Sequence, residues 1–340
     1  MNPWMIVLAV LVLCAALLWP RYGIVARWRR ARLLAARSQR EDVLKHILKS
    51  EAEGRQPTLD SIAGALQVTT GQAADLLQQL ETYGLVSFEV GVLLLKPAGR
   101  EMALHIVRAH RLWESYLAEQ TGVAEVEWHQ RAERQEHLLT PQQAAALSAR
   151  LGHPTRDPHG DVIPEAPDDL AAEQGQPLHA IAANTPVQFT HIEDEPETIY
   201  AQLCAQGLRP GMKAFVIEKT ADRIRFWADG NEHVLAPVLA NNITVVLLPD
   251  FKTEDLTEEQ FLSGLRVGER AKVLGLTPAC RGAERRRLLD LGFVAGTPVE
   301  VEMVSPAGDP TAYRVRGTVI ALRREQAGLI RITAEKAIAA

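Results

Sequence analysis

Histidines and carboxylates recur at helical spacing between residues 110 and 137 of this 340-residue chain. At about 100° per residue, four potential ligands of the later run share one helix face: His129, Glu133, Glu136 and His137. The preceding helix adds His110 and Glu114, one turn apart on a single face. Imidazole and carboxylate ligands without thiolate suit Mn²⁺ or Fe²⁺, and zinc or cobalt could occupy such a site in vitro. The spacing therefore predicts a divalent transition-metal site built on two helices.

The same residue types have a plainer interpretation. A single pair such as His110 and Glu114 is typical of an ordinary solvated helix face, and this alternative stays open for each pair taken alone. No water-activating residue stands apart from the ligands, which disfavours a hydrolytic metal site. The sequence also shows no nucleophile–base pair and no phosphate loop, so we do not expect an enzyme. The three cysteines are widely spaced, which excludes a thiolate zinc site or a disulfide framework.

The elements that position these ligands follow a recognisable order. Residues 41–51 form a helical run that ends at the Glu53-Gly54 break, and a short helix opens at Thr58. The segment Thr69-Thr70-Gly71 ends this helix and can cap a third one over residues 72–83. Residues 85–96 are β-rich around a glycine and predict a two-stranded hairpin. Three helices followed by a hairpin indicate a winged helix-turn-helix over residues 41–98, with the third helix offered to a DNA major groove.

The C-terminal half contains an internal repeat. The pattern Leu203-x-x-x-Gly207-Leu208-x-x-Gly211 recurs as Leu288-x-x-x-Gly292-Phe293-x-x-Gly296, at a constant offset of 85 residues. Two copies rich in strand and turn signals predict two small β-barrels, over residues 179–250 and 263–336, joined by the acidic linker 252–259.

The N-terminus is apolar from Pro3 to Trp19, with tryptophans near both ends and several arginines after it. About seventeen apolar residues reach the short end of the range for a membrane-spanning helix, and positive charge after the span favours a cytoplasmic location for the rest of the chain. We therefore expect a transmembrane anchor over residues 1–20 and a basic juxtamembrane helix over residues 21–40. The predicted location is the cytoplasmic membrane, single-pass, with the soluble domains in the cytoplasm.

Three stretches together resemble one known family. The winged helix, then His110-Arg111-Leu112-x-Glu114 and Glu133-x-x-Glu136-His137, and the loop from His153 to Pro164 resemble the diphtheria toxin repressor and manganese transport regulator family. The resemblance covers about residues 41–165 and extends more loosely into the first barrel. It implies a homodimer that binds Mn²⁺ or Fe²⁺ through metal-binding and dimerisation helices at residues 99–165, and in which bound metal favours binding to a DNA operator.

The resemblance also implies two metal sites. His110, Glu114 and His129 match its ancillary site, to which the first barrel adds Glu195 or Glu197, and we take Glu197 as the candidate. The residues that match the primary site are Glu133, Glu136 and His137 on the later helix and Asp42 on the first helix. Glu133 and Asp42 are the residues of the manganese branch, although that branch has a carboxylate where this chain has Lys45.

The second barrel resembles a FeoA-type domain, the SH3-like module associated with ferrous-iron transport. The matching segments are Leu291-Gly292-Phe293-x-x-Gly296 and the later Arg314-Val315-Arg316-Gly317. The fold expected for the whole chain is α+β: an N-terminal transmembrane helix, a winged helix-turn-helix, a helical dimerisation domain and two small SH3-like β-barrels.

The predicted recognition helix contains no lysine or arginine from Thr70 to Tyr83, and the wing has none either. Phosphate contacts normally supply much of the affinity for DNA, so the uncharged helix is unusual for a DNA-binding unit. The residues expected to contact DNA are Thr69, Thr70, Gln72, Asp75 and Gln79. The arginines at 27–40 could bind the DNA backbone instead, but we expect them to form a juxtamembrane helix that faces anionic lipid.

Two functions remain open from the sequence. The favoured one is a membrane-tethered transcription regulator in which a metal ion controls DNA binding by the winged helix. The alternative is a membrane-bound metal-sensing adaptor whose winged helix no longer binds DNA and whose FeoA-type barrel docks on a ferrous-iron transporter. The intact order of sensor and winged helix supports the first. The uncharged recognition helix, the anchor and the extra barrel support the second.

Overall fold

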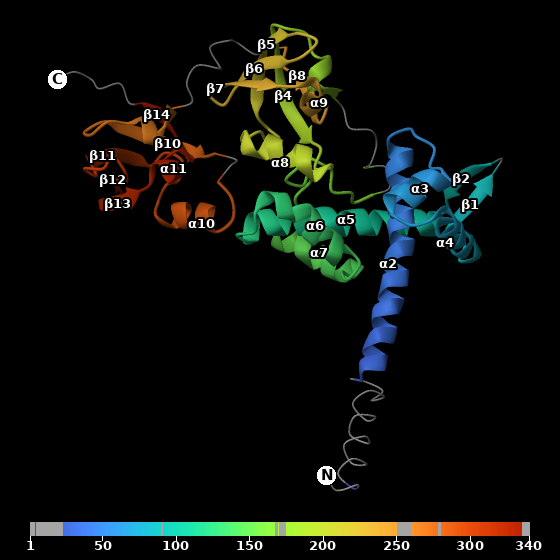
Figure 1. The fold of residues 1–340 in the computed structure, drawn as a ribbon. Coiled ribbons are helices and arrows are strands. Elements are labelled where there is room, and N and C mark those ends of the chain that lie inside the picture. Colours follow the sequence, from blue (N-terminus) through green and yellow to red (C-terminus); the bar gives the residue numbers. More distant parts are fainter. Residues whose placement is uncertain are drawn as a thin grey trace. The chain divides into compact units, whose positions relative to one another are not determined.

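The computed structural model describes residues 4, 23–89, 91–166, 169, 175–249, 260–277 and 280–334. By their contacts these residues divide into two compact units, and Figure 1 labels their helices and strands. The first unit contains residues 1–109, 136–141 and 164–172, and the second contains residues 110–135, 142–163 and 173–340.

The first unit contains the winged helix, and its elements follow the predicted order. These are α2 (Ile24–Ala52), α3 (Leu59–Ala65), α4 (Thr70–Thr82), β1 (Val86–Glu89) and β2 (Val92–Leu95). Thr58 and Thr69 each cap the following helix through a reciprocal capping box, with Ser61 and Gln72 respectively. The apolar faces of α2, α3 and α4 form one core with the hairpin, which includes Leu44, Ile62 and Leu80.

The basic segment and the first winged-helix helix are one continuous element. Helix α2 runs from Ile24 to Ala52 without a break, so the arginine-rich part and the predicted ligand Asp42 share one helix. Its end lies where the sequence predicts it, because Glu53 is the C-cap and Gly54 has a φ of +69°.

The prediction of an N-terminal transmembrane helix is wrong for the fold that the structure describes. Among the described residues, no helix combines the length and the apolar composition that crossing a bilayer requires. The predicted span at residues 1–20 lies outside the described residues, apart from Trp4. The described part of α2 carries arginines at six of its first seventeen positions, which excludes an apolar span there. The predicted location in the cytoplasmic membrane depended on this helix, and we withdraw it as well.

The helices that carry most of the predicted ligands follow the hairpin. They are α5 (Pro97–Gln120), the 3₁₀ turn η1 (Glu125–Glu127), α6 (Trp128–Glu136) and α7 (Pro141–Arg150). Gly99 lies in the first turn of α5, at a point where any Cβ would clash with the Leu85 carbonyl. This close approach fixes the start of α5 against the winged helix, within the first unit.

The predicted repeat appears as two antiparallel sheets of the same topology. The first sheet has the order β3-β8-β4-β5-β6-β7 and the second β9-β14-β10-β11-β12-β13. Each β-domain inserts one helix after its second strand, and each has its own core, around Phe189 and Phe226 in one and Phe293 and Tyr313 in the other.

The strands of the first sheet are β3 (Gln176–Pro177), β4 (Thr185–Ile192), β5 (Lys213–Lys219), β6 (Ile224–Ala228), β7 (Asn231–Leu235) and β8 (Ile243–Leu247). The strands of the second are β9 (Gln260–Phe261), β10 (Arg270–Leu276), β11 (Pro298–Val304), β12 (Thr311–Val315), β13 (Thr318–Leu322) and β14 (Ile330–Ala334). The helices of the two β-domains are α8 (Glu197–Ala205) and α9 (Pro237–Ala240), then α10 (Gly282–Asp290) and α11 (Arg324–Ala327).

Candidate metal centres

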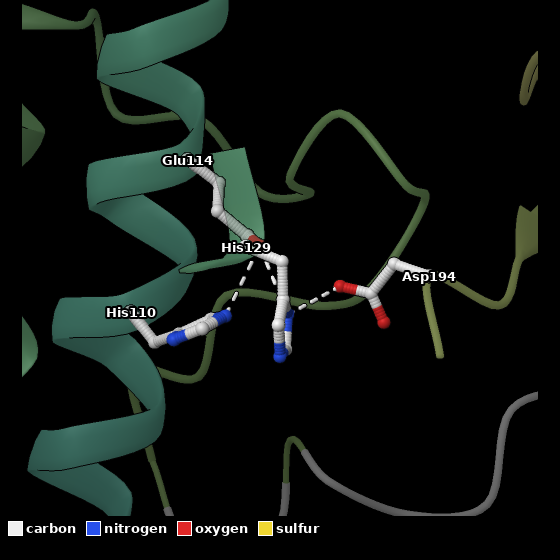
Figure 2. Close-up of side chains that lie close together, drawn as sticks. All are labelled: His110, Glu114, His129 and Asp194. Carbon is white, nitrogen blue, oxygen red and sulfur yellow. Dashed lines mark hydrogen bonds and ion pairs between the residues drawn. The ribbon is translucent and has the colours of Figure 1, made fainter. Parts of the chain in front are cut away.

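The second unit brings two histidines and two carboxylates into one group, which we call the His129 cluster (Figure 2). Its members are His110, Glu114, His129 and Asp194, whose potential ligand atoms all lie within 4.8 Å of one another. Helix α5 supplies the first two residues, α6 supplies His129, and Asp194 follows β4. Glu114 Oε1 lies 3.0 Å from His110 Nε2 and 3.6 Å from His129 Nδ1. The predicted facing of the two helices is therefore present in the structure.

His129 lies at the centre of an excess of negative charge. Its Nδ1 is 2.6 Å from Asp194 Oδ2, and its Nε2 is 3.5 Å from Glu133 Oε1 and 3.6 Å from Glu195 Oε1. Burial favours the neutral ring, but the carboxylates of Asp194 and Glu114 outweigh it and raise the pKa of His129 far above its ordinary value. The histidines hold the pKa of buried Glu114 well below its usual range, although burial alone would raise it. A divalent cation would balance these carboxylates, so the donor set fits a metal ion.

His159 is an additional neighbour that the sequence did not single out. Its Nδ1 lies 3.1 Å from Asp194 Oδ2, and its ring, which is 2% exposed, packs against the rings of Trp128 and Tyr200. Burial lowers the pKa of His159, but the charges of Glu114 and Asp194 raise it to about 10. In the sequence, the loop from His153 to Pro164 was informative only through its resemblance to the family. Its chemical role depends on contacts with β4 that the sequence pattern does not show.

The loop reaches the cluster because its backbone packs tightly on β4. Gly160 has a φ of +101°, and any Cβ there would clash with the Thr190 carbonyl. The His159 carbonyl accepts a hydrogen bond of 2.9 Å from Ile192 N. Buried Asp157 turns the loop, since its Oδ1 accepts hydrogen bonds from the backbone N–H groups of His159 and Asp161. Burial raises the pKa of Asp157 to about 8.

The first unit contains a second group, the His137 cluster, made of Asp42, Glu136 and His137. His137 Nε2 is 3.1 Å from Asp42 Oδ1 and 3.6 Å from Glu136 Oε1. Burial lowers the pKa of His137, but the carboxylates of Asp42 and Glu41 raise it to about 9. Three of the four residues that the resemblance assigns to the primary site meet here, from α2 and the end of α6, and their donor types fit a divalent cation.

Two residues next to the His137 cluster decide its local charge. Glu41, which is 2% exposed, accepts a hydrogen bond from His137 Nδ1 at 2.8 Å and another from Arg37 Nε at 2.6 Å. Burial raises the pKa of Glu41, but these two hydrogen bonds lower it overall. Lys45 Nζ donates to both carboxylate oxygens of Glu136, at 3.1 and 2.9 Å. An ammonium group therefore stands where the manganese branch was expected to have a carboxylate.

Two predicted ligands lie elsewhere than expected. Glu133 belongs to a group with His129 and Glu195, whereas the resemblance assigned it to the primary site. Glu197 begins α8 and lies outside the metal-capable groups of the described residues. Asp194, which lies shortly after β4, belongs to the His129 cluster, and Glu195, the other candidate from the first barrel, belongs to the group with His129 and Glu133.

The predicted DNA-binding residues are on α4 or at its cap. Thr69 and Gln72 bind each other, because Gln72 N donates to Thr69 Oγ1 at 3.2 Å and Thr69 N donates to Gln72 Oε1 at 3.0 Å. Thr70 is the first residue of α4. The side chains of Asp75, Gln78, Gln79, Thr82 and Tyr83 line a shallow hollow of about 340 Å³ on the exposed face of α4.

Comparison with known proteins gives two family matches. Residues 96–165 match the family described as "Iron dependent repressor, metal binding and dimerisation domain", and residues 261–334 match the FeoA domain. The iron-dependent repressor IdeR of Mycobacterium leprae is 29% identical over 211 residues, which cover 58% of this chain and 91% of that protein. The diphtheria toxin repressor of Corynebacterium diphtheriae is 27% identical over 217 residues, covering 60% of this chain and 95% of the relative.

Two further similarities differ in what they cover. A solved structure of a manganese-dependent transcriptional repressor in complex with manganese is similar with a TM-score of 0.56 and 28% identity, over 62% of this chain and all of that chain. A probable metal transport system membrane protein of Chlamydia trachomatis is 44% identical over 82 residues. The aligned part is only 18% of that transport protein, so its activity is not transferred to this chain.

A winged helix followed by helices that carry two histidine–carboxylate clusters is the arrangement of a metal-responsive regulator. The matches support a metal-dependent regulator of the diphtheria toxin repressor family, and the chain carries a C-terminal FeoA domain.

Proposed function

We propose that the chain is a divalent-metal-responsive transcription regulator that binds DNA through its winged helix. One observation carries this assignment: Asp42 lies on the first helix of the winged helix and meets Glu136 and His137 in one metal-capable group. A divalent ion bound there would neutralise the carboxylates and tie α2 to the end of α6. The winged helix would then be held in one arrangement, and the metal concentration would set how much of the protein can bind DNA.

The physiological cofactor in this proposal is Mn²⁺ or Fe²⁺. The ligands of both clusters are carboxylates and imidazoles, which favour these ions over those that prefer thiolates. The similar solved repressor is named as manganese-dependent, and the IdeR relatives are iron-dependent by name. Both ions therefore stay in the proposal. By the same analogy the active form is a homodimer on a DNA operator.

The adaptor hypothesis rested on a membrane anchor, the uncharged recognition helix and the second barrel. No helix of the described residues has the properties of a membrane anchor. The uncharged α4 also favoured an adaptor, but the guanidinium of Arg40, on α2, lies against residues of its exposed face.

DNA binding by the full chain tests the proposed function. A duplex from the region upstream of its own gene is titrated with protein under anaerobic conditions, with Mn²⁺, with Fe²⁺ or with a chelator, and fluorescence anisotropy is recorded. We expect either metal to increase the affinity at least about tenfold, which is the usual size of an allosteric coupling. If neither metal gives binding above that of competitor DNA at about 0.1 M salt, where phosphate contacts still contribute strongly, the regulator assignment fails.

Matched variants show whether the His137 cluster is the sensor. The double substitution Glu136→Ala and His137→Ala should abolish the metal response and remove one high-affinity site in calorimetry. The control is His153→Asn, which changes an exposed histidine outside both clusters and keeps a residue type that tolerates the φ of +56° at this position. An unchanged metal response in the double variant would rule out the His137 cluster as the sensor.

A further inference from the structure

Positive charge on the winged helix is concentrated in one unexpected place. Between Thr70 and Leu95, which includes α4 and the hairpin, there is no lysine or arginine. The preceding part of α2, residues 24–40, contains six arginines and no acidic residue. We call residues 27–40 the basic arm. A winged helix that binds DNA needs phosphate contacts, and the basic arm is the strongest source of them next to α4.

The geometry of the helix gives the basic arm a charged face. At about 100° per residue, Arg29, Arg30, Arg37 and Arg40 fall within an arc of about 100°. Arg27 lies about 140° from Arg40, on the other side of the helix. The side chains of Arg29 and Arg30 are exposed to solvent, and 54% of the Arg37 side chain is exposed.

Arg40 joins this charged face to the recognition helix. Its guanidinium lies 5.5 Å above the centre of the Tyr83 ring, and its Nη1 is 3.5 Å from Gln79 Oε1. Both partners also line the shallow hollow on α4. The Arg40 guanidinium is therefore held against the exposed face of α4, which has no cationic side chain of its own. The contact with the Tyr83 ring restricts the position of the guanidinium.

We propose that the charged face of the basic arm, which excludes Arg27, binds the backbone phosphates of DNA and that Arg40 sets its position relative to α4. This assignment rests on the proposed function. Guanidinium groups bind phosphate through parallel hydrogen bonds, while the neutral side chains of Gln78, Gln79 and Thr82 suit contacts to base edges. Asp75, the acidic residue of the hollow, would repel a phosphate, which is a further reason to place the phosphate contacts on the arm.

The salt dependence of DNA binding tests the arm directly. The test variant is Arg29→Gln with Arg40→Gln, which leaves Arg37 and its contact with Glu41 intact. The control is Arg27→Gln with Lys49→Gln, which removes the same charge from the opposite side of α2. Each full-length protein, loaded with Mn²⁺, is titrated against the upstream duplex and against a scrambled duplex of equal length at several salt concentrations.

We expect the test variant to bind both duplexes about 10- to 100-fold more weakly at about 0.1 M salt, with a slope of log K against log salt that is smaller by about 2. The control should keep its affinity within about twofold. A test variant with the slope of the wild type would overturn the assignment of the arm and leave the proposed function standing. Absence of duplex binding by the wild-type protein would instead overturn both.

Vesicles of phosphatidylglycerol are the competing probe, since Trp28 and Leu33 are exposed on the arm and an anionic lipid surface would also attract its arginines. If the test variant loses vesicle binding and keeps duplex binding unchanged, the arm is not a DNA-binding element. Loss of duplex binding with the expected change of slope supports it whatever the vesicles show.

Discussion

At the scale of single residues, Glu41 decides which nitrogen of His137 faces the metal-capable group. Its carboxylate holds Nδ1, so that Nε2 points to Asp42 and Glu136. A carboxylate behind a ligand histidine fixes the ring and increases its basicity, and its loss typically costs about 10- to 100-fold in metal affinity. We expect Glu41→Gln to weaken Mn²⁺ binding at the His137 cluster by this factor in calorimetry.

The matched control for Glu41→Gln is Glu53→Gln, an exposed glutamate at the end of the same helix. It should leave the affinity unchanged. Restored affinity in Glu41→Asp would show that a carboxylate is required at this point. A Glu41→Gln protein that binds Mn²⁺ within about twofold of the wild type would contradict a positioning role.

The raised pKa of His137 predicts a pH dependence of stability in the metal-free protein. The folded pKa is about 9 against an ordinary value of 6.5, so the protonated ring stabilises the fold. This contribution is fully present below about pH 6.5 and is lost as the pH rises through about 9. We expect it to amount to at most about 3 kcal/mol. Urea unfolding of the wild type and of His137→Asn, with chelator, measures it as the difference between the two at each pH.

The two proteins should therefore differ most at about pH 6 and approach each other above about pH 9. A difference that grows with pH would contradict the assignment of the raised pKa to His137. Bound metal should show the opposite trend, because the ion competes with the proton for Nε2.

At the scale of elements, the loop before the first sheet controls the position of His159. Gly160 combines a φ of +101° with a backbone that leaves no room for a Cβ. Gly152, in the same loop region, has a φ of +79° and open space around it. We expect Gly152→Ala to cost only the strain of its backbone, about 1–2 kcal/mol, and Gly160→Ala to cost clearly more.

Calorimetry separates the local consequences of the two substitutions. Gly160→Ala should also weaken metal binding at the His129 cluster, because His159 and Asp194 are placed by this loop and β4, and should leave the His137 cluster unaffected. Equal effects of the two alanine variants on stability and metal binding would show that the close packing on β4 is unimportant.

Elements that depend on local pattern were predicted well from the sequence. The capping residues Thr58 and Thr69, and Gly54 just after the C-cap of α2, mark helix boundaries, so the order of elements in the winged helix could be predicted from the spacing of these residues. The facing of His110 and Glu114 toward His129 required only that two amphipathic helices pack together. The 85-residue repeat predicted a repeated topology, and the two sheets share one strand order.

Contacts between distant segments could not be predicted in the same way. Asp194 lies next to His129 because of where β4 ends, and the sequence pattern does not show this contact. Glu41 was missed because its function comes from contacts with Arg37, one turn earlier, and with His137, which is distant in the sequence. The transmembrane prediction failed for a different reason, since about seventeen apolar residues are only marginal as a span and the described helix begins after them.

At the scale of the whole molecule, metal sensing and the FeoA domain are separable within the described residues. Both metal-capable clusters draw their ligands from residues 42–195, and the FeoA domain has its own core. It contacts the helices through Arg281, which stacks on Trp128 at 5.5 Å, and through Arg286, which donates to the Gln120 carbonyl at 3.3 Å. These contacts add packing next to His159 but no metal ligand.

A chain that ends at Leu248 should therefore bind Mn²⁺ at both clusters with affinities within about threefold of the full chain. Its thermal midpoint should fall, because the Trp128 ring loses the guanidinium that covers it. The variant Arg281→Ala in the full chain is the control, and it should lower the midpoint in the same direction without changing metal binding. A loss of more than about tenfold in metal affinity on truncation would mean that the FeoA domain holds the His129 cluster together, and that the chain senses metal only as one assembled molecule.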